Sequence, residues 1–181
     1  MTPLLPCWLY PSIYRLFHLR ADSKCGDGTK QLFMMAIKEE PRGLRNNNPG
    51  NLVKNNGKPF DGEIKSDDDK FKKFISIGYG YRAIFRTLHT YIEGHKLNTI
   101  RKAIYRYAPP EDGNDTEAYI RSVCSQTGID ENQVIDWRNH DDMVAIVSAI
   151  SCHENGVKAD KNEVERGWNM FINTSDIKKH L

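Results

Sequence analysis

The sequence predicts a mainly α-helical protein with a small β or extended element between residues 50 and 77, and an α+β class is the alternative. Apolar residues recur at spacings of three and four in several segments after residue 80, which is the period of an amphipathic helix. Residues 39–69 are instead rich in Asn, Gly, Pro and Asp, the residue types that form turns.

Capping and breaking residues bound five expected helices. An N-cap side chain accepts a hydrogen bond from the first turn, Gly permits the left-handed C-terminal turn, and Pro cannot continue a helix. In chain order the signals are an apolar stripe from Tyr81 to Ile92, a Thr99 cap with a stop at Pro109-Pro110, an Asp115 or Thr116 cap with a stop at Gly128, a start at Asp141 or Asp142 with a stop at Asn155-Gly156, and an Asn162 cap.

Length and composition favour one domain. The chain has 181 residues, and 39% of them are hydrophobic, which suffices for one core. Residues 1–38 contain three prolines and no sustained period. We therefore expect an N-terminal extension over residues 1–38, to which no function is assigned, and a domain over residues 39–181.

Charge and hydropathy exclude several classes of function. With 26 basic and 24 acidic side chains the formal net charge is only +2, so charge does not indicate a nucleic-acid partner. The apolar stretch at residues 4–19 is too short and too interrupted to span a membrane. It also lacks the basic start and the small-residue cleavage site of a secretory signal. We expect synthesis in a cytoplasm and delivery by another route if the substrate lies outside.

Glu154 is the most informative residue in the pattern. Helical spacing puts it on the apolar face of Met143, Val147 and Ile150, and Asn155-Gly156 is expected to end the helix there. Burial and the negative end of the helix dipole both favour a protonated carboxyl. A protonated carboxyl is what a general acid for glycosidic cleavage requires. The alternative is an ordinary solvated glutamate in a fraying last turn.

Other clusters of polar residues indicate no metal or cofactor. The histidines do not form a ligand triad with acidic residues or cysteines, and the run Asp67–Asp69 lacks the glycine and terminal glutamate of an EF-hand loop. No phosphate-binding glycine loop and no Ser-His-Asp arrangement is visible. We therefore expect neither a metal site nor a cofactor.

Several motifs together resemble a family of phage virion proteins known as structural protein P5, which also occurs in prophages. The similarity runs from about residue 42 to about residue 168. The motifs are Arg42–Leu52 (RGLRNNNPGNL), Phe71–Phe74, Gly78–Ala83 (GYGYRA), Ala108–Glu111, Asn114–Ile120 (NDTEAYI) and His153–Gly156 (HENG). Phe60 and Tyr107 stand where the family often has Trp, and we expect these rings to preserve packing. The resemblance implies a protein of the virion.

A second resemblance concerns chemistry. The motif at Glu154–Gly156 is similar to the catalytic glutamate motif of glucosaminidases and lytic transglycosylases of the lysozyme superfamily. In those enzymes an Asn-rich turn, an extended segment and a helix follow the glutamate. Here Asn46–Leu52 and Phe71–Tyr81 are similar to those parts but precede the glutamate, as a circular permutation would produce. This resemblance implies a lysozyme-like domain that acts on bacterial peptidoglycan.

The expected reaction has Glu154 protonating the oxygen between N-acetylmuramic acid and N-acetylglucosamine. Asp61 and Glu63 are the candidates for a second carboxylate, and Glu39 and Glu40 compete with Glu154 for the catalytic role. A lytic transglycosylase needs one carboxylate, because a hydroxyl of the substrate attacks, so this reaction is favoured over hydrolysis.

Side chains near the glutamate are candidates for substrate binding. The amides of Asn47, Asn48 and Asn51 can hydrogen-bond N-acetyl groups, and the rings of Tyr79 and Tyr81 can stack on sugars. Turn formation by the asparagines and packing by the tyrosines are the alternatives.

Two other functions stay open. One is a non-catalytic virion protein that uses the same fold for assembly with other virion proteins or for glycan binding. The other is a secreted antibacterial effector derived from a prophage, with the same chemistry. For the enzyme, the expected location is the virion, or the periplasm after delivery.

Overall fold

Helices account for most of the regular structure in residues 39–179, which are the residues that the computed structural model describes. The elements of this part of the chain are α2 (Arg42–Arg45), β1 (Glu63–Ile64), β2 (Lys73–Phe74), α3 (Ile77–His89), the π-helix η1 (Thr90–Gly94), α4 (Ile100–Tyr107), the 3-10 helix η2 (Pro110–Asp112), α5 (Thr116–Thr127), α6 (His140–Asn155), α7 (Lys161–Ile172) and α8 (Ser175–Lys178). The predicted mainly α class with a small β element is confirmed.

The chain divides into two units, Met1–Glu40 and Pro41–Leu181. The second unit begins two residues after Glu39, where the sequence places the start of the domain. The predicted extension over residues 1–38 lies outside the described residues. None of the helices within residues 39–179 is long and apolar enough to cross a bilayer.

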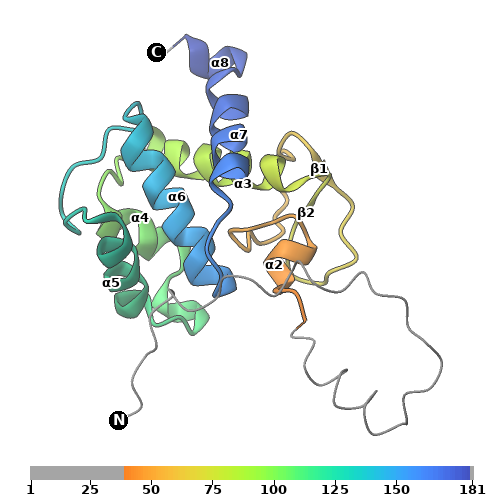
Figure 1. Ribbon diagram of the computed structural model, residues 1–181, viewed down its shortest axis with the longest axis horizontal. Coiled ribbons are helices and arrows are strands. Elements are labelled where there is room, and N and C mark those ends of the chain that lie inside the picture. The colour runs from red at the N-terminus through yellow and green to blue at the C-terminus, as the bar shows by residue number, and fades with distance from the viewer. Residues whose placement is uncertain (1–38, 180–181) are drawn as a thin grey trace, which may run out of the picture. The chain divides into compact units, whose positions relative to one another are not determined.

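The helices of the second unit pack around one apolar core. α3 packs most extensively against α7, while α6 packs against both α5 and α7, and α4 packs against α5 (Figure 1). The stripe predicted for the first helix is buried in this core, at Tyr81, Ile84, Phe85 and Leu88. This helix continues into η1, so the stripe extends to the buried Ile92.

Two predicted helix starts were wrong by one to three residues. α6 begins at His140, and its cap is Asn139, whose side chain accepts a hydrogen bond from the Asp142 N–H. α7 begins at Lys161, and its cap is Asp160, whose side chain accepts from the Asn162 N–H. Several Asn and Asp residues adjoin each start, and every one of them can cap a helix. The path of the preceding loop selects which residue does so.

The β element is an antiparallel pair in which Glu63 lies opposite Phe74 and Ile64 opposite Lys73. An isolated bridge joins Val53 to Phe71. In the antiparallel pair, partners share a face, so the buried Phe74 points inward with Glu63 while Ile64 points outward with Lys73. Backbone hydrogen bonds from the Lys72 N–H to the Leu52 carbonyl oxygen (2.9 Å) and from the Phe74 N–H to the Asn46 carbonyl oxygen (3.0 Å) hold residues 46–52 beside β2.

The first turn of α6 carries an ion-pair network that titrates near neutral pH. Hydrogen bonds to Glu165 (2.9 Å) and Asp141 (2.8 Å) raise the pKa of His140 above its usual 6.5. Its side chain is 43% exposed, so solvent screening holds the contribution to stability below about 1 kcal/mol. This contribution is complete below about pH 6.5 and is lost as the pH rises through the higher pKa of the folded state.

The variant His140→Gln is therefore expected to be less stable than wild type at pH 5.5 and equally stable at pH 9. Urea unfolding followed by circular dichroism at both pH values measures the difference. A deficit that is the same at both values would show that His140 acts through packing against Trp168, whose ring centroid lies 5.4 Å away, and not through its charge.

Candidate functional site

Glu154 lies in the last turn of α6, where the sequence places it. The helix ends at Asn155, and Gly156 follows with a φ of 66°, which is the left-handed C-terminal turn expected there. The Glu154 side chain is half-buried. Its Oε1 accepts a hydrogen bond from the Tyr119 hydroxyl at 2.8 Å, and its Oε2 accepts one from the Asn51 amide at 2.9 Å.

The asparagine-rich turn, residues 46–52, lies against this end of α6. Asn155 donates hydrogen bonds through its side-chain amide to the carbonyl oxygens of Pro49 and Ser151, both at 2.8 Å. Figure 1 shows α2 and the start of this turn beside the C-terminal end of α6. Asn51 adopts a φ of 47°, a left-handed conformation that Asn tolerates better than most residues. In this backbone conformation, the side-chain amide of Asn51 reaches Glu154.

Two of the three asparagines proposed for substrate binding hold the turn together. Asn48 is fully buried, donates to the carbonyl oxygens of Leu52 and Lys72, and accepts from the Leu52 N–H. Because Asn48 has no exposed atom to offer a sugar, the predicted contact is wrong for this residue. Asn47 is half-buried and donates to the Phe74 carbonyl oxygen. Substrate contacts by Asn47 and Asn51 stay predictions.

The two tyrosines proposed for sugar stacking differ in exposure. Tyr81 is 2% exposed, and its hydroxyl lies 3.2 Å from Ser151 Oγ. Burial raises the pKa of Tyr81. A ring enclosed by the core cannot stack on a sugar, so that part of the prediction is wrong. Tyr79 is half-buried, and its ring packs over Gly62, where a β-carbon would collide with it.

A cluster of aromatic residues around Glu154 was missed at the level of sequence. Tyr119 is 3% exposed, and burial followed by the charge of Glu154 raises its pKa well above 10. Tyr107 lies edge-on to Tyr119 at 6.5 Å between ring centroids and donates a 2.5 Å hydrogen bond to the Gly50 carbonyl oxygen. The signal was present, because a tyrosine in an apolar stripe needs a partner for its hydroxyl.

His153 completes this cluster from the exposed side. Its ring stacks on that of Tyr119 with 3.7 Å between centroids and 19° between planes. The imidazole face against Tyr119 is shielded from water, and this partial desolvation lowers the pKa of His153, while the charge of Glu154 opposes the effect.

The other candidate carboxylates are engaged elsewhere or exposed. Asp61 forms a 2.5 Å ion pair with Arg82, and Glu63 forms a 2.8 Å ion pair with the buried Lys72. Glu39 and Glu40 are exposed and have no regular secondary structure. Glu154 instead accepts hydrogen bonds from the Tyr119 hydroxyl and the Asn51 amide.

Gly43 in α2 controls how closely the turn and α6 approach. A β-carbon at this position would collide with Asn155 Oδ1 and lie 2.8 Å from Asn51 Oδ1 and 2.9 Å from the Asn48 carbonyl oxygen. Both side-chain oxygens are buried, and no hydrogen-bond donor among the described residues reaches them. Only a hydrogen atom at Gly43 leaves them room.

The variant Gly43→Ala is therefore expected to lose about 2–3 kcal/mol of stability and to displace the Asn51 amide from Glu154. Urea unfolding measures the first effect. Comparison of side-chain amide signals in NMR spectra of wild type and variant measures the second. An unchanged unfolding midpoint would mean that the turn shifts away from α6 at little cost.

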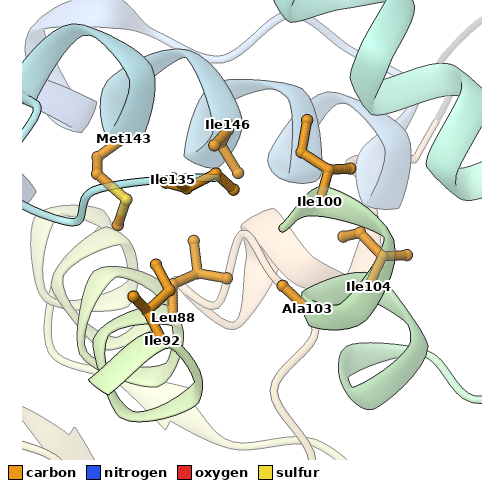
Figure 2. Close-up of a pocket in the computed structure, with 8 residues that line it drawn as sticks. All are labelled: Leu88, Ile92, Ile100, Ala103, Ile104, Ile135, Met143 and Ile146. Carbon is orange, nitrogen blue, oxygen red and sulfur yellow. The ribbon is translucent and has the colours of Figure 1, made fainter. Parts of the chain in front are cut away.

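Glu154 does not line either of two hollows found among the described residues. The gap between α3, η1, α4 and α6 has a volume of only about 10 Å³ and is lined by apolar side chains, which Figure 2 shows pointing into it. That is room for at most one water molecule, so the gap is a packing defect. An open hollow on the outer face of α7 includes Glu165, Arg166 and Met170. Residues 39–179 contain no group of three or more His, Cys, Asp or Glu side chains placed to hold a metal ion.

Comparison with known proteins gives the family. No model of a protein family matches the sequence. The chain is 38% identical over 141 residues to Protein P5 of Pseudoalteromonas phage PM2, and this alignment covers 76% of the chain and 86% of the phage protein. Identity at this level over most of both chains shows common descent, and the chain belongs to the family of phage protein P5.

Proposed function

We propose that this phage protein cleaves the glycan strands of bacterial peptidoglycan as a lytic transglycosylase, with Glu154 as its acid and base. The observation that carries the proposal is the pairing of Glu154 with Asn51 at 2.9 Å across 103 residues of sequence. This contact joins the helix-end glutamate to the asparagine-rich turn, the two features whose resemblance to lysozyme-superfamily enzymes the sequence suggests. Glu154 is half-buried, so its carboxyl can meet a substrate.

The proposed reaction uses the Glu154 carboxyl twice, first as an acid and then as a base. Protonated Glu154 donates to the oxygen that bridges N-acetylmuramic acid and N-acetylglucosamine, and the bond from that oxygen to C1 of the muramic acid breaks. The C6 hydroxyl of the same muramic acid attacks C1 and returns its proton to the Glu154 carboxylate. Each carboxylate oxygen accepts one hydrogen bond from the protein, and its second lone pair is available for this transfer.

The ion pairs of Asp61 and Glu63 favour a mechanism with one carboxylate. Inverting and retaining hydrolases use a pair of carboxylates that flank the scissile bond. Asp61 is paired with Arg82 and Glu63 with Lys72, so each is already neutralised by a cation. A transglycosylase does not depend on either. As a phage protein, the enzyme would be carried by the virion and would reach the peptidoglycan in the periplasm after delivery.

A non-catalytic structural role is the second candidate, and one observation favours it. Both oxygens of Glu154 are hydrogen-bonded within the protein, so the carboxylate also works as a clamp between α5, α6 and the asparagine-rich turn. On this reading the protein would contact other virion proteins or bind glycan without cleaving it.

Digestion of purified Gram-negative peptidoglycan, followed by mass spectrometry of the soluble products, tests the proposal. The expected products end in 1,6-anhydro-N-acetylmuramic acid. Reducing ends in their place would indicate hydrolysis and would overturn the transglycosylase mechanism. No soluble products, from protein shown to be folded by circular dichroism, would favour the structural role.

A further inference from the structure

The aromatic ring of Tyr119 connects an exposed histidine to the proposed acid. His153 precedes Glu154 on α6, and its imidazole lies 3.7 Å from the Tyr119 ring, nearly parallel to it. The hydroxyl of the same tyrosine donates to Glu154 Oε1 at 2.8 Å. His153 is exposed while Tyr119 is buried, so the imidazole lies between solvent and one face of the buried ring.

The orientation of Tyr119 depends on its two ring neighbours. His153 covers one face, and Tyr107 approaches edge-on at 74° between planes. Tyr107 is in turn held by its hydrogen bond to the Gly50 carbonyl oxygen. Aromatic pairs of this kind prefer defined geometries, so removal of the imidazole would release the tyrosine that orients Glu154.

We propose that His153 is a positioning residue for Glu154, which acts through Tyr119 and whose charge adjusts how readily Glu154 gives up its proton. This inference rests on the proposed function for its effect on catalysis. Its physical core, the coupling between the two side chains, can be measured without any substrate.

The electrostatic environment of His153 makes this coupling effective at acidic pH. Glu154 on the same helix is the charged group that acts on His153. Tyr119 from α5 is buried and Tyr107 from α4 is half-buried. Desolvation raises the pKa of each well above 10 and keeps both neutral. Partial desolvation lowers the pKa of His153 below 6.5, so the imidazole is neutral at pH 7 and gains a proton on acidification.

Protonated His153 would stabilise the ionised form of Glu154. The imidazolium is attracted by the π face of Tyr119, and its positive charge favours a nearby carboxylate. Glu154 would then hold its proton less tightly, so an acid that must be protonated at the start of the reaction becomes scarcer. On the basic side of the pH–rate profile, the rate falls as Glu154 loses its proton. We expect this fall to occur at a lower pH in wild type than in a protein whose Glu154 lies beside a neutral ring.

The variant His153→Phe keeps a stacking ring and removes the charge. Its basic limb is expected to move up by about half a pH unit, the coupling of unit charges across one ring at a dielectric near that of water. His153→Ala removes the stack as well and is expected to lower kcat, and His153→Phe is expected to restore it. Superposition of the wild-type and His153→Phe profiles would overturn the proposal, because a purely structural role moves no limb.

Coupling between two titrating groups is reciprocal, so the charge of Glu154 must also shift the pKa of His153. This shift can be measured without an activity assay. NMR titration of wild type and Glu154→Gln is expected to show the pKa of His153 lower by a similar half unit in the variant. The titration of His140, at the opposite end of α6, is the internal control and should not change. An unchanged His153 titration would overturn the proposal. A shifted titration in a protein that releases no glycan supports the coupling and overturns the proposed function instead.

Discussion

The variant Glu154→Gln is expected to release glycan products about 10²–10⁴ times more slowly than wild type, the range for loss of a general acid. Its stability should stay close to that of wild type. The glutamine carbonyl oxygen can accept the hydrogen bond from Tyr119 that Glu154 accepts now. Asn51 can turn its amide, since its own Oδ1 is buried without a donor among the described residues, and can then accept from the glutamine.

A matched control removes a carboxylate at the opposite end of α6. Glu165→Gln changes a residue of α7 that bonds His140 at the first turn of α6, and activity should be retained. Turbidity loss of a peptidoglycan suspension, with unfolding midpoints measured in parallel, compares the variants. Equal lysis by wild type and Glu154→Gln would move the acid to Glu39, Glu40 or Glu63. Loss of folding in the glutamine variant would point to the structural clamp.

The variant Gly80→Ala is expected to lose about 3 kcal/mol or more of stability. Gly80 lies inside α3, where alanine would otherwise stabilise the helix by about 1 kcal/mol. A β-carbon there would collide with the Asn47 carbonyl oxygen and lie 2.5 Å from Pro49 Cδ. The obstacle is mostly backbone of the asparagine-rich turn, which a side-chain rotation cannot relieve. The variant should therefore separate α3 from the turn and weaken the site.

Gly94→Ala is the matched control for Gly80→Ala. It makes the same change at the end of η1, where the nearest heavy atom to a new β-carbon is Thr90 Cγ2 at 3.8 Å, an ordinary contact. Its stability should equal or slightly exceed that of wild type. Urea unfolding measures both variants under the same conditions. If the two variants proved equally stable, the turn would not be packed against α3 as closely as described.

Local chemistry explains why the helices could be predicted and some of their ends could not. Thr99 and Asp115 cap α4 and α5 as expected, and Gly128 and Gly156 end α5 and α6 in left-handed turns. Each of these signals acts within one turn of its own helix. The starts of α6 and α7 were misplaced because neighbouring Asn and Asp residues offer the same cap. The protonation expected of Glu154 stays a prediction, which the pH–rate profile tests.

The sequence by itself determined the helical class, the place of the small β element and the position of Glu154 at the end of α6. These follow from periodicity and from caps, which involve residues close along the chain. Only the tertiary structure decided which side chains surround that glutamate. Asn51 reaches it across 103 residues and Tyr119 across 35, and His153 lies against Tyr119 because α5 packs on α6. Packing also decided that Asn48 and Tyr81 are interior, since the same residue types serve equally well in a turn, a core or a binding site.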